Sequence, residues 1–188
     1  MMIRSSHLGF TSAAASLLLI AGSTAVAMPS SAHGDDGDDA ATLAVTSQLR
    51  DLRPLVVDPT DGARSTLRMT IEDDEATFTL KLHGLDPAAA GRTFGAHLHF
   101  GSCIAGDGLA ALGHYNTDVV AGRTPVRTSP HTEVWLDFTV TEGGRAKART
   151  SVPFAPLAGI RSIVIHQDPT NDRTGVAGPR LACLPVAW

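Results

Sequence analysis

Short stretches in which apolar and polar residues alternate recur along most of the chain. The clearest are STLRMTI (65–71), ATFTLKL (76–82), VWLDFTV (134–140), AKARTSV (146–152) and IRSIVIH (160–166). Alternation with a period of two, together with many β-branched residues, predicts β-strands. Turn-rich segments such as EDDE, TEGG and DPTNDRTG separate them, and no stretch has a convincing helical period. The pattern therefore predicts an all-β fold, an antiparallel sandwich or barrel.

The first 27 residues have the composition of a secretory signal peptide. Arg4 precedes an apolar stretch that ends in the small-residue pattern Ala25-Val26-Ala27, which favours cleavage after Ala27. The apolar stretch is too short for a comfortable membrane span. We therefore expect an exported protein, secreted or held in the periplasm or cell envelope, with no membrane attachment after cleavage. An uncleaved N-terminal anchor is the alternative.

Beyond the signal peptide, the chain divides by composition into two parts. SSAHGDDGDDAA, residues 31–42, has four aspartates among small residues and no apolar period, which is typical of a solvated tether. We expect an acidic, flexible segment over 28–62 and one β-barrel domain over 63–188. The chain has 188 residues, 43% of them hydrophobic and 18% charged, and this is enough to bury one core.

Charge and cysteine content narrow the function classes. The formal net charge is -4, which offers no basic stripe for nucleic acid, and no later segment is apolar for long enough to cross a membrane. Cys103 and Cys183 are the only cysteines. An even pair in an exported chain usually forms a disulfide. It would close a loop of about 80 residues and stabilise the fold by about 4 kcal/mol in the chain-entropy model.

The stretch GAHLHFGSC places two histidines one residue apart. On a strand, residues i and i+2 point to the same face, so His97 and His99 can present two imidazoles to one metal ion. His114, His131 and His166 are candidates for further ligands. Four nitrogen ligands suit copper(II). Such a pair alone is a weak signal, since surface or packed histidines explain it equally well.

Four motifs in order resemble the copper/zinc superoxide dismutase family, particularly its exported bacterial branch, over roughly residues 65–186. GAHLHFGSC resembles the family's GFHxHxxGxC, GHYN its GGH(F/Y)(D/N), IVIHQD its (V/I)(V/I)H strand and TGVAGPRLAC its TGxAGxRxAC ending. The fifteen residues from His99 to His114 also match. The resemblance implies a Greek-key β-sandwich or barrel, and a disulfide between Cys103 and Cys183.

The same resemblance implies a copper site and an activity. It makes His97, His99, His114 and His166 the copper ligands, with His114 also exchanging a proton, and Arg180 the residue that orients the substrate anion. A guanidinium beside an open copper position would orient superoxide through charge-assisted hydrogen bonds. The expected function is an exported superoxide dismutase that forms O2 and hydrogen peroxide. The alternative is a non-catalytic copper-binding or structural domain with the same fold.

The zinc site of that family is only partly present. In the family, the residue that corresponds to His114 also binds zinc, together with two more histidines and an aspartate. His131 has the expected position, but Gly122 and Val134 replace the other two ligands. Structural zinc normally needs four ligands. We therefore expect copper with zinc absent or weak, as in copper-only members, and His131 as a residual zinc ligand or a neighbour of a copper ligand.

Three carboxylates remain as substitutes for the missing zinc ligands: Asp118, Glu133 and Asp137. Glu133 is also the candidate for holding the second ring nitrogen of His114, since a carboxylate can orient a ligand imidazole and raise its basicity. An exposed glutamate at the start of a strand is the alternative interpretation.

Overall fold

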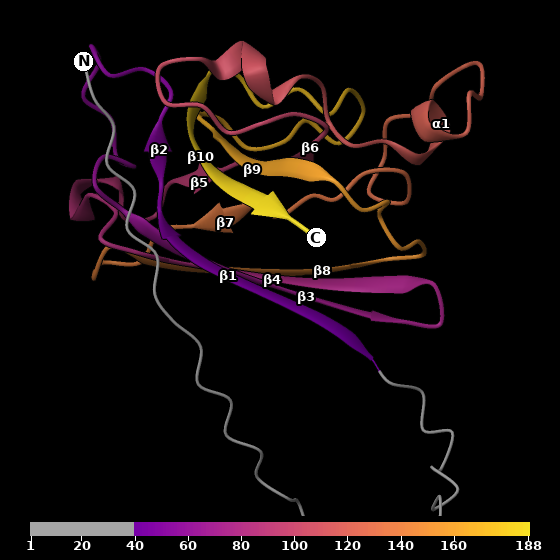
Figure 1. The fold of residues 1–188 in the computed structure, drawn as a ribbon. Helices are drawn as coiled ribbons and strands as arrows, with labels where there is room; N and C mark the ends of the chain where they lie inside the picture. The colour runs from indigo at the N-terminus through magenta and orange to yellow at the C-terminus, as the bar shows by residue number, and fades with distance from the viewer. Residues whose placement is uncertain (1–39) are drawn as a thin grey trace, which may run out of the picture. The chain divides into compact units, whose positions relative to one another are not determined.

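The computed structural model describes residues 40–188. The expected signal peptide lies outside the described residues, as does most of the acidic sequence before residue 42. The described part consists of strands in antiparallel pairs with little helix. This confirms the predicted all-β class, and the strands form two layers (Figure 1).

The first layer is a four-stranded sheet in the order β1-β3-β4-β8. Its strands are β1 (Ala41–Gln48), β3 (Arg64–Glu72), β4 (Glu75–His83) and β8 (Arg145–Val152). A tight turn joins β3 to β4, and both of its residues, Asp73 and Asp74, have positive φ. Short polar residues tolerate that left-handed conformation better than bulky ones do, which explains why an acidic pair makes this hairpin.

The second layer has the order β2-β10-β9-β6. Its strands are β2 (Arg50–Asp51), β6 (Ala96–His99), β9 (Ile160–His166) and β10 (Arg180–Ala187), and a separate short pair joins β5 (Thr93–Phe94) to β7 (Phe138–Thr139). Neighbours such as β4 and β8, or β6 and β9, are distant in sequence. The chain therefore crosses between the layers, as the expected Greek-key sandwich requires.

Within residues 40–188, helical structure is confined to single turns. They are η1 (Pro87–Ala89), η2 (Gly108–Ala111) and α1 (Thr117–Val120). The side chain of Asn116 caps α1 by accepting from the backbone N–H groups of Asp118 and Val119, which is the usual way to satisfy the free donors of a helix start. In the described residues, no helix is both long enough and apolar enough to span a membrane.

The main core lies between the layers and is formed by alternate residues of the strands. On β4 the inward side chains Phe78, Leu80 and Leu82 are fully buried, and Ile163 and Ile165 of β9 belong to the same cluster. Each such side chain contributes roughly 1.5–3 kcal/mol relative to an exposed position. The alternation of apolar and polar residues that predicts the strands thus also identifies the side chains that form the core.

The outer side of the second sheet is also buried. Val164 of β9 packs there with Cys183 and Cys103 in a smaller cluster, and Cys103 and Cys183 form the expected disulfide. This bond attaches the loop after β6 to β10. Loops therefore cover the outer side of this sheet, and β9 is apolar in consecutive positions because both of its faces are covered.

Two boundaries differ from the expectation. Residues 41–48 form β1, which pairs with β3 over its whole length, so the sandwich begins before residue 63 and the segment 28–62 is not flexible throughout. Leu43 and Val45 alternate along β1 and pack against the core. The predicted strand 134–140 is reduced to β7, because its residues before Phe138 make a single isolated bridge, from Trp135 to His97.

Candidate metal centre

His97 and His99 project from β6 to the outer side of the second sheet. Ala96 and Leu98, the alternate residues, belong to the main core, so the strand period turns both histidines away from it. His97 pairs with Val164 across the sheet and makes a bridge to Trp135. Both imidazoles are completely buried under the covering loops.

His114 and His166 complete a cluster of four histidines. His114 follows η2 and makes a bridge to His99, and His166 is the last residue of β9. One ring nitrogen from each of the four lies within 4.8 Å of every other. The structure thus brings together all four residues that the sequence suggested as copper ligands.

Backbone carbonyls orient two of these rings. Nδ1 of His99 donates to the carbonyl oxygen of Leu112 at 3.1 Å, and Nδ1 of His166 donates to the carbonyl oxygen of Gly178 at 3.1 Å. These bonds fix the proton on Nδ1, because a carbonyl can only accept. The two Nε2 atoms, 3.3 Å apart, therefore point their lone pairs into the cluster.

A threonine and an aspartate orient His97. The Thr170 hydroxyl donates to Asp137 Oδ1 at 2.6 Å, and its oxygen lies 2.7 Å from His97 Nε2. Because the hydroxyl proton is directed to Asp137, the threonine oxygen accepts from His97 Nε2–H. His97 Nδ1 is buried and has no hydrogen-bond partner among the described residues. Such an atom needs an explanation, and a bound cation supplies one.

Glu133 orients the fourth ring. Its Oε2 lies 2.9 Å from His114 Nδ1 and accepts from Trp135 Nε1, while Oε1 accepts from the Asn116 amide. Burial raises the pKa of Glu133, but the hydrogen bonds from His114, Trp135 and Asn116 outweigh it and bring the pKa below its usual value. The carboxylate is therefore charged, and His114 is left with Nε2 for the cluster.

The cluster disfavours protons on its own nitrogens. Burial lowers the pKa of His97 far below its usual value, that of His99 to about 2 and that of His166 to about 4, with the neighbouring histidines as a further cause. Neutral imidazoles are the form that binds metal. The donor set is four nitrogens with one free lone pair on each ring, which fits a copper ion.

Arg180 lies beside the cluster. It is the first residue of β10 and pairs with His166 across the sheet. Its guanidinium donates to the carbonyl oxygens of Gly108 and Leu112. Burial lowers the pKa of Arg180, yet arginine stays charged at any physiological pH. The loop of η2 thus holds a fixed positive charge close to His99 and His166.

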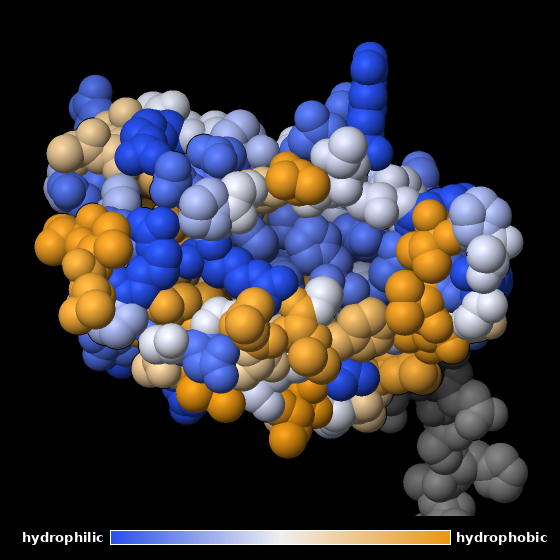
Figure 2. Space-filling view, turned by 90° about the horizontal axis from the view of Figure 1, so that it is seen from above, coloured by the Kyte–Doolittle hydropathy of each residue, from blue (hydrophilic) through white to orange (hydrophobic). Residues whose placement is uncertain are grey.

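The face that contains these loops is hollowed. Figure 2 shows this side with a hydrophilic floor between hydrophobic rims. Exposed apolar residues of the η2 loop include Leu109 and Leu112.

The residues considered for zinc do not converge. His131 is exposed, and its backbone N–H donates to the Ser129 hydroxyl; it belongs to none of the potential ligand groups of the described residues. Asp118 is buried and accepts from Arg123 and Arg127, and these hydrogen bonds, Arg127 first, lower its pKa well below the usual value despite the burial. The structure does not support a role for His131 next to the copper ligands.

The remaining positions of the expected zinc site have other surroundings. Val134 is buried in the main core, Gly122 lies in an exposed turn after α1, and Asp137 is bound to Thr170. Thr170 and the Leu112 carbonyl are parts of the centre that the sequence did not reveal. A threonine within DPTND and a backbone oxygen carry no sequence signal of their own.

Comparisons with known proteins agree with the fold. One family model, described as copper/zinc superoxide dismutase (SODC), matches residues 63–185. The crystal structure of the clock protein EA4 has a TM-score of 0.53 and 20% identity, covering 76% of this chain and 90% of that one. A double mutant of a SOD-like protein from Bacillus subtilis has a TM-score of 0.54 and 18% identity, covering 76% and 97%. No curated protein matches the chain.

Proposed function

Because the chain belongs to the copper/zinc superoxide dismutase family, we propose that it is a superoxide dismutase that works with copper and without zinc. The observation that carries the proposal is the convergence of four ring nitrogens within 4.8 Å, each with its partner nitrogen already held. His97 would bind through Nδ1, and His99, His114 and His166 through Nε2. A copper ion bound there would supply one-electron redox chemistry.

Arg180 is the residue that receives the substrate. Superoxide is a small anion, and the guanidinium carries five N–H donors in a fixed plane. Carbonyl oxygens of Gly108 and Leu112 hold two of its nitrogens in place. The remaining donors can bind an anion through charge-assisted hydrogen bonds, and their fixed position avoids the cost of ordering a free side chain.

His114 is the residue placed to handle a proton. Dismutation of two superoxide ions takes up two protons and yields O2 and hydrogen peroxide. Glu133 keeps Nδ1 of His114 protonated, so a second proton can only be held at Nε2. Nε2 is also the proposed copper-binding atom, so His114 can hold this proton and pass it to the reduced substrate only while Nε2 does not bind the metal.

Glu133 also supports the absence of zinc. In the zinc-containing family the residue corresponding to His114 also binds zinc, and here a buried carboxylate lies 2.9 Å from its Nδ1. The carboxylate performs the orienting role that the second metal otherwise has.

The proposed location is outside the cytoplasm. The disulfide between Cys103 and Cys183 is typical of oxidising compartments, and this agrees with the expected signal peptide. Superoxide formed outside the cell or in its envelope would be the substrate.

The direct test is to load the protein with copper under zinc-free conditions and to measure superoxide dismutation. H99A removes one ligand, and H83A removes an exposed histidine at the end of β4 as a matched control. Rapid turnover that H99A abolishes and H83A retains supports the proposal. Stoichiometric copper without turnover would indicate a copper-binding domain, and activity only after zinc addition would contradict the zinc-free site.

A further inference from the structure

The outer side of the first sheet carries a concentration of positive charge. Alternation along β3, β4 and β8 turns one set of side chains to solvent. We call the cationic members of this set the basic face: Arg64, Arg68, Lys81, Arg145, Lys147 and Arg149. It is unrelated to the metal centre, which lies on the outer side of the other sheet.

The strand register aligns these charges in three rows. Arg64 and Arg145 lie on either side of His83 in the first row, Lys81 lies directly opposite Lys147 in the second, and Arg68 and Arg149 lie on either side of Thr79 in the third. Successive rows are about 7 Å apart and neighbouring strands about 5 Å. The basic face therefore measures roughly 14 Å by 10 Å.

No carboxylate of the three rows compensates these charges. The outward neighbours on β1 are Ala44, Thr46 and Gln48, and the ion pairs between described residues lie elsewhere. Like charges directly opposite each other destabilise a sheet. The whole chain has a net charge of -4, so a generally basic composition does not explain them.

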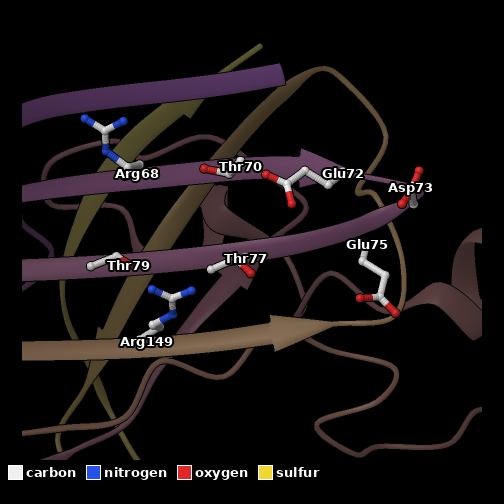
Figure 3. A pocket seen from close by; sticks show the side chains of 8 residues that line it. All are labelled: Arg68, Thr70, Glu72, Asp73, Glu75, Thr77, Thr79 and Arg149. Carbon is white, nitrogen blue, oxygen red and sulfur yellow. The ribbon is translucent and has the colours of Figure 1, made fainter. Parts of the chain in front are cut away.

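A groove begins at the third row. Figure 3 shows Arg68 on β3 and Arg149 on β8 on either side of Thr79, with Thr70 and Thr77 further along. Glu72, Asp73 and Glu75 close its far end at the β3–β4 hairpin. The two guanidinium groups and the hydroxyls between them can bind an anionic group, while the acidic hairpin limits how far a polyanion extends in that direction.

We propose that the basic face binds an anionic polysaccharide. None of the large exposed hydrophobic side chains lies on these strands, so nothing there inserts into a lipid surface. The three rows hold no phenylalanine, tyrosine or tryptophan on which bases could stack, and the imidazole of His83 is their one aromatic ring. Guanidinium and ammonium groups interspersed with hydroxyls match sulfate or carboxylate groups spaced along a sugar chain.

The test measures binding of a heparin decasaccharide by titration calorimetry in 0.15 M NaCl, with neutral dextran as the blank. K81Q/K147Q/R149Q removes three charges of the basic face. K81R/K147R keeps the charges, and R92Q/R173Q removes two exposed charges from segments outside this sheet. We expect the triple variant to lose at least tenfold in affinity and both controls to stay within twofold. Binding should also weaken steeply with salt.

Unfolding cannot explain a loss of binding by the triple variant, because this variant removes the charge repulsion between Lys81 and Lys147. A melting temperature at or above that of the unmodified protein verifies that the variant is folded. Absence of heparin binding, or binding by the triple variant within twofold of the unmodified protein, overturns the proposal. Tighter binding of a 20-base-pair DNA duplex or of phosphatidylserine vesicles than of heparin overturns the choice of a polysaccharide. None of these readouts depends on copper or turnover.

Discussion

His99 and Arg180 donate to the same acceptor, the carbonyl oxygen of Leu112. One backbone atom therefore sets both the ring orientation of a proposed copper ligand and the position of the charge proposed to receive the substrate. Leu112 holds this carbonyl with φ 58° and ψ -151°, a conformation that residues other than glycine rarely adopt. Strain at this residue accompanies the geometry that the centre uses.

Replacing Leu112 by glycine tests this relationship. Glycine adopts positive φ without steric cost, and the leucine side chain is 59% exposed, so little packing is lost. L112G should raise the free energy of unfolding by about 1 kcal/mol, part of the 1–3 kcal/mol typical of such strain. Dismutase activity should be retained. Urea denaturation measures the first quantity. L109G, in the adjacent η2 turn, should instead destabilise, and equal losses in both variants would contradict the interpretation.

Thr170 should tune copper binding through His97. T170V keeps the shape of the side chain but removes the oxygen that accepts from His97 Nε2 and donates to Asp137. We expect a 10–100-fold loss of copper affinity, as is typical when a partner of a metal ligand is removed. Competition with a chelator measures it. T170S should restore affinity, and T139V, which breaks an exposed hydroxyl pair with Thr93, should leave it unchanged. A T170V affinity within twofold of the unmodified protein would contradict this role.

The metal-free protein should lose stability on mild acidification. The pKa of His166 is lowered to about 4 and that of His99 to about 2, so between these values and 6.5 the unfolded chain binds protons that the folded protein does not. The free energy of unfolding is therefore highest above pH 6.5 and falls as the pH drops and the unfolded chain takes up these protons. From pH 7.5 to 5.5 each histidine should remove about 1.4 kcal/mol.

Urea unfolding of the metal-free protein at the two pH values measures this loss. H166Q should reduce this loss of stability by the share of one histidine. Glu133 does not contribute in this window, because its pKa lies below the usual carboxylate value. Equal stability at pH 7.5 and 5.5 would show that the histidines are accessible to protons in the folded state.

Much of the fold could be predicted because alternation reports directly on burial. The stretches 65–71, 76–82, 146–152 and 160–166 each lie within an observed strand. The strand β1 could not be predicted, because its alternating residues are only weakly apolar and directly follow an acidic sequence of small residues. Over 134–140 the alternation is real, with Val134 and Leu136 in the core, but the backbone makes few strand pairs.

The four histidines could be predicted because motif and spacing identify them. Their partners could not be identified to the same extent. For Glu133 the sequence left two interpretations open, a partner of His114 or an exposed glutamate. Only the fold shows its contact with His114. Thr170 reaches His97 across 73 positions of sequence, and no local pattern indicates a contact at that distance.

The disulfide should stabilise both the fold and the position of Arg180. C103S/C183S opens a loop with a sequence separation of 80, and the chain-entropy model gives a loss of about 4 kcal/mol. The same loop carries the Gly108 and Leu112 carbonyls that hold Arg180. We therefore expect KM for superoxide to rise in the double variant even at temperatures where it is folded. Unchanged KM would indicate that η2 keeps its place without the covalent link.

Because Lys81 and Lys147 repel each other, a substitution that removes this repulsion should raise the stability of the sheet and lower the affinity for heparin. K147E creates an opposite-charge pair across β4 and β8 and should stabilise the sheet by roughly 0.2–1 kcal/mol. The same variant should bind heparin more weakly than the unmodified protein. Thermal unfolding and titration calorimetry on one preparation measure both effects. If K147E has the same stability and the same heparin affinity as the unmodified protein, the charges of Lys81 and Lys147 do not interact measurably.

The histidine centre and the basic face lie on the outer sides of opposite layers of the sandwich, whose arrangement is seen in Figure 1. A molecule attached to a polymer through the first sheet would turn its hydrophilic hollow away from that polymer and toward the surrounding medium. Neighbouring molecules attached in the same way would share this orientation. Bound in this way, the proposed dismutase would form an oriented layer, and superoxide arriving from the medium would meet this layer before it reached the polymer beneath.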